Sequence, residues 1–282
     1  MKTLILILLF AVQTFGQSSL ILLMSDDILV ETKAYQTRVL ADGGIVVDLE
    51  AVNSAYKSIK SANIMDSLWG FWDANFGVKK DANNKVTKLY NLIGSSDLVQ
   101  TDTSLSPIWY ADSLEGKATM KFSSKRLLSS IIPNQTYGWS FYTVAQIQTA
   151  NNPTILGETG NGTNYNFYLF NGIGLNMLYG GSTNGTNALR SGSTRAIYTN
   201  NIIGASIDPS DGNRARNYSN GSSVATAQLS SPILTYNNVN FIVGMVRTVT
   251  VLNPFIGNIS SLIMSKDVIA EPVWLNQYYK VY

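Results

Sequence analysis

Hydrophobic and polar residues alternate with a period of two over much of the chain, and this pattern predicts β-strands. The stretch 140–149 (SFYTVAQIQT) would place two sets of side chains on opposite faces of one strand. The two sets are Phe141, Thr143, Ala145 and Ile147, and Tyr142, Val144, Gln146 and Gln148. Similar apolar runs are NFYLFNG, LNMLYGG, NVNFIVGMV and FIGNISSLIMS. Many short strands with little helix predict an all-β protein, an antiparallel β-sandwich or jelly roll.

Turn signals separate the strand-like runs. Segments such as GNGTN, STNGTN and DPSDGN carry the residues that turns prefer. The segment NYSNGSSVAT predicts a hairpin with Asn220–Gly221 in its turn.

Helical periodicity is expected in two short places. Asp48 is a suitable N-cap for a helix whose buried face would carry Val52, Tyr56 and Ile59. Upstream, Gly43–Gly44 indicates a turn. Near the end of the chain, a second helix would start at Pro272 and place two aromatic residues on one face, Trp274 and Tyr278. The five tryptophans lie mainly in strand-like or helical runs, so we expect most of them in the core.

Composition divides the chain into three parts. No charged side chain occurs from Thr3 to Ser25, and asparagine is absent before Asn53 but frequent afterwards. We therefore expect an apolar arm at residues 1–25, a connector with a short helix at 26–63, and a sandwich at 64–282.

The arm has three interpretations. As a signal peptide it has the positive residue Lys2, the apolar core Leu4–Val12 and small residues (TFGQSS) at the expected cleavage site. As a membrane span, residues 3–25 are long enough, but polar residues at 13–19 interrupt them. As a structural arm it would be buried between subunits of an assembly, because two exposed apolar runs would promote aggregation. Membrane contact is expected only through this segment.

Composition also excludes several kinds of chemistry. The chain has no histidine, which removes the commonest general base and excludes serine–histidine and cysteine–histidine nucleophile systems. It has no cysteine and so no disulfide. Lysine and arginine total 20 against 18 acidic residues, without a basic tract, so a nucleic-acid partner is not expected.

An ordered set of segments resembles the concanavalin A-like, laminin-G-type lectin domains of bacterial surface proteins and bacteriophage proteins. The set is SLWGFWDANFG, KVTKLYNLIGSSDLVQTD, SPIWYADSLEGKATMKFSS and FIGNISSLIMSKDVIAEPVWLNQYY, over about residues 66–282. The resemblance implies two curved antiparallel sheets and recognition of glycans or proteins. The connector segment AYQTRVLADGGIVVDLEAVNSAY resembles a segment found upstream of such domains in phage structural proteins.

These resemblances favour a virion structural protein, a fibre, spike or decoration subunit. It would form a homo-oligomer, contact other virion proteins and bind host-surface glycan or another surface ligand through its sandwich. The alternative is a secreted or cell-surface bacterial lectin-like protein with a cleaved signal peptide. A third reading is a polysaccharide hydrolase or lyase of the same fold.

Paired carboxylates, which retaining glycosidases of this fold use, are missing. Such a pair on one strand needs acids at positions i and i+2. None of the three glutamates of the sandwich has an acid two residues away; they are Glu115, Glu158 and Glu271. We therefore predict that the chain is not an enzyme.

Aromatic, amide and arginine side chains gather in the loops of residues 160–195, and such groups recognise sugars. The candidate ligand-binding residues are Tyr165, Asn166, Tyr179, Asn187, Arg190 and Arg195. For each of them, ordinary loop solvation is the alternative. In IDPSDGN, Asp208 and Asp211 offer oxygen ligands for Ca²⁺, although Asp-Pro and Asp-Gly are also typical of turns. No other cofactor is expected.

Overall fold

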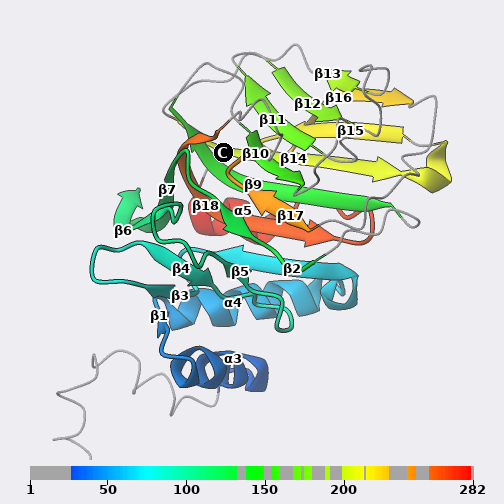
Figure 1. Cartoon of the computed structure of the whole chain (residues 1–282). Helices are drawn as coiled ribbons and strands as arrows, with labels where there is room; N and C mark the ends of the chain where they lie inside the picture. Colours follow the sequence, from blue (N-terminus) through cyan, green and yellow to red (C-terminus); the bar gives the residue numbers. More distant parts are fainter. Residues whose placement is uncertain are drawn as a thin grey trace, which may run out of the picture.

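Two antiparallel sheets make up most of the computed structural model. The structure describes residues 27–131, 138–148, 154–158, 168–172, 175–179, 188–190, 199–212, 214–228, 240–245 and 254–280. Figure 1 shows the two sheets together, with the helices along one side. The prediction of an all-β sandwich is confirmed.

Sheet A contains ten strands in the order β1-β3-β4-β5-β8-β17-β10-β11-β12-β13. In that order their bounds are Ile45–Val46, Gly77–Lys80, Val86–Leu89, Leu98–Val99, Leu127–Leu128, Phe241–Val243, Thr154–Glu158, Tyr168–Gly172, Leu175–Tyr179 and Ala188–Arg190. The described parts of the segments NFYLFNG, LNMLYGG and NVNFIVGMV contain β11, β12 and β17, as the apolar runs predict.

Sheet B has the order β16-β15-β14-β9-β18-β7-β6, and β2 pairs with β18 beyond the end of β7. Their bounds are Ser222–Gln228 (β16), Arg214–Ser219 (β15), Asn200–Asp208 (β14), Trp139–Ile147 (β9), Ile256–Ser265 (β18), Lys117–Ser123 (β7), Ile108–Leu114 (β6) and Leu68–Asp73 (β2). The predicted hairpin is confirmed: β15 and β16 meet at Asn220 and Gly221, both at positive φ, where asparagine and glycine are the least strained residues.

The main core lies between the two sheets. The alternation of β9 is confirmed here, because Phe141, Ala145 and Ile147 join this core whereas Tyr142 and Val144 belong to a second cluster. Large residues of both sheets fill the space between them, including Trp72, Trp139, Phe122, Phe241 and Phe255. Trp72 and Phe241 pack edge to face, with ring centroids 5.7 Å apart.

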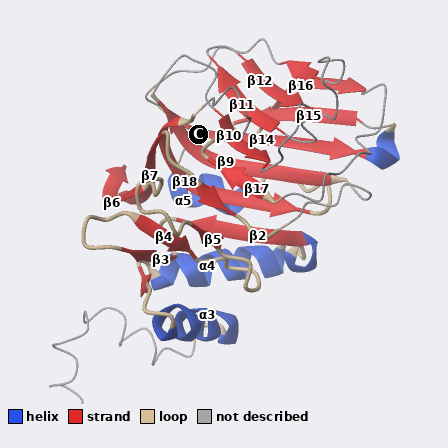
Figure 2. Cartoon of the chain, viewed as in Figure 1, coloured by secondary structure: helices blue, strands red, loops and turns tan. Residues whose placement is uncertain are grey.

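Two helices cover the outer face of sheet B. They are α4 (Leu49–Ser61) and α5 (Val273–Tyr279), and Figure 2 shows them on the same side of the strands. Asp48 caps α4 by accepting from the amide of Ala51 over 2.9 Å, as predicted. The expected shared face of α5 is also found: the Trp274 and Tyr278 rings stack with centroids 4.6 Å apart. The outer face of β9 is therefore apolar as well, beneath these helices.

The connector contains a helix that the sequence pattern did not predict, α3 (Val30–Ala41). Its buried side chains include polar Thr32 and Gln36, so apolar periodicity is weak, and no side chain caps its start. The helix lies at the edge of the molecule (Figure 1), where it contacts α4 and strands β1 and β3. The connector also adds β1 to sheet A, where Ile45 pairs with Val78.

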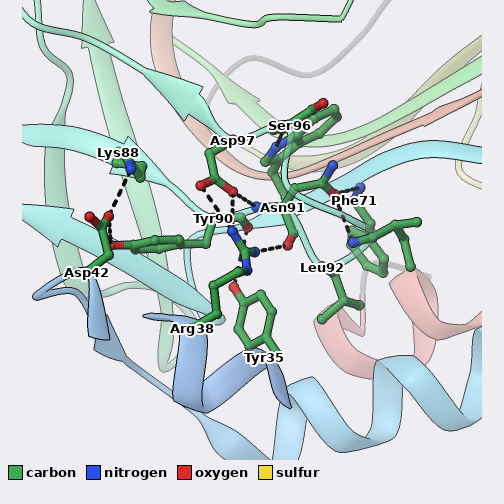
Figure 3. A network of polar contacts seen from close by, with 12 residues as sticks. Tyr35, Arg38, Asp42, Phe71, Lys88, Tyr90, Asn91, Leu92, Ser96 and Asp97 are labelled. Atoms are coloured by element: carbon green, nitrogen blue, oxygen red, sulfur yellow. Dashed lines mark hydrogen bonds and ion pairs between the residues drawn. The ribbon is translucent and has the colours of Figure 1, made fainter. Parts of the chain in front are cut away.

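Arg38 fastens α3 to the sandwich (Figure 3). Its guanidinium donates to both carboxylate oxygens of Asp97, over 2.9 and 3.1 Å, and to the carbonyl oxygen of Asn91 over 2.6 Å. It also lies over the rings of Tyr35 and Tyr90, 5.5 and 5.4 Å from their centroids. These contacts join the connector to the β4–β5 segment of sheet A.

In the described ranges the remaining short elements are two 3-10 helices, η1 (Met65–Ser67) and η3 (Pro209–Asp211). Among the helices of the described ranges, none combines the length and the apolar character needed to cross a lipid bilayer.

Candidate functional site

The outer face of sheet B changes from apolar to polar at one end of its central strands. There Gln146 on β9 lies directly opposite Asn200 on β14 and Asn258 on β18. Two residues earlier on β9, Val144 lies opposite Ile202 on β14. Side chains alternate along a strand, so the three amides share the face that α4 and α5 cover further along.

Hydrogen bonds within this row fix part of its geometry. The side-chain carbonyl of Gln146 accepts from Asn258 Nδ2 over 3.0 Å and from Gln148 Nε2 over 3.4 Å. The Asn200 Oδ1 atom is buried and has no hydrogen-bond partner in the described structure. A buried amide oxygen without a donor costs free energy, so this atom is suited to a donor from a bound molecule.

A pocket of about 360 Å³ opens over Gln146 and Asn200. The β6–β7 turn forms one wall with Ser113, Leu114 and Glu115, and the other lining residues are Thr199 and Lys280. Glu115 and Gly116 both have positive φ, 52° and 81°, which is the pattern of a tight hairpin turn. Lys280 follows α5 and is also left-handed, at φ 51°.

The lining is mostly polar and carries both a carboxylate and an ammonium group. Amides donate and accept, Glu115 accepts and Lys280 donates, so the pocket can bind a ligand with several hydroxyl groups. Within the part of the chain that the structure describes, no three acidic, histidine or cysteine residues are grouped to hold a metal ion.

The predicted sugar-binding loop residues are not brought into this pocket by any described contact. Tyr165, Asn166, Asn187 and Arg195 lie outside the described residues. The backbones of Tyr179 and Arg190 end β12 and β13, two neighbouring strands of sheet A, and their side chains also lie outside the described part. Those assignments stay predictions.

Asp208 and Asp211 lie at η3, and each has partners in the protein. Asp208 caps the helix, accepting from the amides of Ser210 and Asp211 over 3.0 and 3.3 Å. Hydrogen bonding from Ser210 lowers the pKa of the Asp208 carboxyl. Asp211 pairs with Arg214 and Arg216, over 2.9 and 3.0 Å. Turn capping and ion pairing therefore account for both residues, and Ca²⁺ binding here stays a prediction.

The amide row is the feature that sequence reasoning missed. Its signal is present: Gln146 continues the outer-face alternation of Tyr142 and Val144, and asparagine occurs in both NNII and FIGNIS. What the sequence does not give is the register that places Asn200 and Asn258 on either side of Gln146.

Comparisons with known proteins support the fold. No family model and no curated protein matches the chain. A Trypanosoma rangeli sialidase, solved in complex with 2,3-difluoro-KDN, is similar with a TM-score of 0.52 and 11% identity, over 82% of this chain. The chain spans 40% of the length of that sialidase. At this identity the likeness shows a shared fold.

Two further solved structures are less similar. The CBM40 domain of the Ruminococcus gnavus IT-sialidase has a TM-score of 0.42 and 20% identity, over 48% of this chain and 79% of that one. A candidate carbohydrate-binding protein from Bacteroides ovatus has a TM-score of 0.42 and 16% identity, over 54% and 44%. At these scores neither match adds to the fold assignment.

The sialidase likeness corrects the prediction that the chain is not an enzyme. That prediction rested on the missing pair of carboxylates, whereas sialidases are an exception to the two-carboxylate scheme and use a tyrosine nucleophile. Because the fold also occurs in an enzyme of that class, the lack of histidine and of paired acids does not exclude catalysis.

Proposed function

We propose that the sandwich binds a glycan in the pocket over the amide row. The observation that carries the proposal is a pocket lined by amide, hydroxyl and charged groups, one of whose lining residues, Asn200, has a buried side-chain oxygen without a hydrogen-bond partner in the described structure. If the Asn200 side chain turns toward the pocket, a sugar hydroxyl would donate to this oxygen and supply the hydrogen bond that it lacks in the described structure. The neighbouring Lys280 and Glu115 would contact further hydroxyl groups.

A rigid floor favours selective binding here. Asn258 is buried and holds the Gln146 carbonyl, while strand pairing fixes Asn200 opposite Gln146. Side chains held by packing and hydrogen bonds lose little conformational entropy when a ligand binds. The row therefore presents its groups in one arrangement before the sugar arrives.

The test is a glycan array followed by calorimetry with the best glycan, using full-length protein. Asn200→Ala should weaken binding at least about tenfold, which corresponds to ~1.4 kcal/mol. Asn83→Ala, a change at an exposed asparagine in the β3–β4 turn, is the matched control and should leave affinity unchanged. Equal affinities for all three proteins would place the binding site elsewhere, for example in the loops 160–195.

A second candidate function is glycoside cleavage in the same pocket. Glu115 favours it, because this carboxyl lines the pocket and could transfer a proton to or from a bound sugar. Release of new reducing ends from the bound glycan tests this function. Cleavage that Glu115→Gln abolishes, with affinity retained, would support it, and the absence of product would contradict it.

The biological setting we propose is the virion, where the connector would attach the protein to the particle (the mount) and the sandwich would bind the host surface. The Arg38 contacts favour such a mount, because they attach α3 firmly to sheet A. A secreted or cell-surface lectin-like protein is the alternative. Mass spectrometry of purified phage particles tests the proposal, and recovery of the protein only from the culture medium, with a cleaved leader, would support the alternative.

A further inference from the structure

A groove runs between α4 and α5, on the side of the molecule formed by the helices. Its outer part measures about 550 Å³. Eight residues line it: Ser54, Lys57, Ser58, Ser61, Ala62, Val273, Trp274 and Gln277. At its inner end lies a smaller apolar pit whose lining includes Ile59, Ile64, Leu68, Phe71 and Ile263. The groove and the pit share Val273, which is 66% exposed.

The start of the described chain is attached beside this groove. Asn53 Nδ2 donates to the carbonyl oxygen of Asp27 over 3.2 Å, and Asn53 Oδ1 accepts from the amide of Leu29 over 3.0 Å. The Asp27 carboxylate pairs with Lys57, 2.8 Å away. Lys57 is itself a lining residue of the groove. Asp27, the first residue that the structure describes, therefore lies at the rim of the groove.

The residues that precede this point are strongly apolar. Leu20–Met24 reads LILLM, and only two residues separate it from Asp27. Cleavage of a signal peptide at the small residues near Gly16 would leave this apolar run on the mature chain. The run must therefore be shielded from water with or without cleavage. Five residues of extended chain reach about 16 Å, farther than the diameter of one helix.

We propose that the apolar segment Leu20–Met24 of the same chain occupies the groove between α4 and α5, with its leucines over Val273 and in the pit. The match is one of chemistry and position, since an apolar run starts next to an apolar hollow. Covering Val273 and the segment together would remove two exposed apolar surfaces from water. The segment would then be part of the fold, leaving neither a membrane anchor nor a contact for another subunit at these residues.

Engineered cysteines give a direct test, because the natural chain has none. In the full-length protein, Leu22→Cys is combined with Val273→Cys. A disulfide needs the two Cα atoms within about 7 Å. The matched control combines Leu22→Cys with Tyr110→Cys, an exposed position on strand β6 that does not line the groove. Both proteins are oxidised under dilute conditions and separated on non-reducing gels, and mass spectrometry identifies the linked peptides.

The proposal expects an intramolecular disulfide in the groove pair that forms at least about tenfold faster than in the control pair. Equal rates in the two proteins would overturn it, as would the absence of a disulfide in the groove pair. A disulfide-linked dimer would show that a second copy supplies the segment and would also overturn it. A mature chain that starts after Met24, measured on the natural protein, would remove the proposed occupant.

Discussion

Tyr279 donates its phenolic hydrogen to the carboxylate of Asp73 over 2.6 Å, and this bond joins the end of α5 to the end of β2 in the buried interior. Asn75 donates to the same carboxylate through its backbone and side-chain nitrogens, over 2.8 and 2.9 Å. These donors are all neutral. Burial therefore dominates and raises the pKa of Asp73 to about 6, although the hydrogen bonds from Tyr279 and Asn75 oppose it.

Replacing this buried acid should change the pH dependence of folding. A carboxyl whose pKa rises on folding destabilises the fold where it must ionise, so the wild type loses stability as pH increases from about 4 to 6. Asp73→Asn removes this loss. Relative to wild type, the variant should gain ~2–3 kcal/mol of unfolding free energy between about pH 4 and pH 7, measured by urea unfolding.

An exposed acid provides the control of opposite sign. Hydrogen bonds from Ser104 lower the pKa of Asp102, so this carboxylate stabilises the fold above its unfolded pKa and loses that effect on acidification. Asp102→Asn should therefore lose stability relative to wild type as the pH increases. A difference between wild type and Asp73→Asn that stays constant across the pH range would contradict the assignment.

Substitution of Arg38 should loosen the connector without unfolding the sandwich core. Arg38→Ala leaves the largely buried Asp97 carboxylate without its guanidinium, a loss of ~2–3 kcal/mol. Arg38→Lys should recover less than half, because an ammonium group cannot reproduce the planar set of donors. The Lys57–Asp27 pair is more exposed, so Lys57→Ala should cost less than ~1 kcal/mol. Hydrogen exchange of the α3 amides would locate the effect, and uniform exchange changes across both sheets would contradict it.

The strands of the sandwich were predictable because each carries its own local signal. The β9 alternation, the Asn220–Gly221 turn and the Asp48 cap depend on neighbouring residues alone. The α3 helix was missed because tertiary contacts of Tyr35 and Arg38 stabilise it in place of an apolar stripe. Helical stability of this kind depends on partners that are distant in the sequence.

The candidate site was less predictable because register creates it. Asn200, Gln146 and Asn258 are separated by more than fifty residues at each step, and only the pairing of three strands brings them side by side. The prediction that the chain is not an enzyme rested on the absence of a carboxylate pair, and the sialidase likeness corrects it, because sialidases do not follow the two-carboxylate scheme. Local sequence patterns predict single helices and strands, whereas a pocket formed by several strands can be located only when their arrangement in the fold is known.

Gly244 should be harder to replace than Gly94, although both glycines have a positive φ. It follows β17 at φ 93°, and an added Cβ would lie 2.4 Å from the Phe122 ring and 2.6 Å from the Lys125 carbonyl oxygen. Gly244→Ala should cost ~3–4 kcal/mol, the sum of left-handed backbone strain and overpacking. Gly94 is the matched control, at φ 74° with open space around the added Cβ, and Gly94→Ala should cost only ~1–2 kcal/mol.

A double-mutant cycle separates the two costs of Gly244→Ala. Phe122 is fully buried, so Phe122→Leu alone should destabilise the protein by leaving a gap. In the double variant the smaller side chain of Phe122→Leu leaves room for the methyl group of Gly244→Ala. The double variant should therefore lose less stability than the sum of the two single variants, by at least ~0.5 kcal/mol. Strict additivity would show that the Phe122 ring does not contribute to the cost, and equal losses for Gly244→Ala and Gly94→Ala in urea unfolding would show that backbone strain alone sets it.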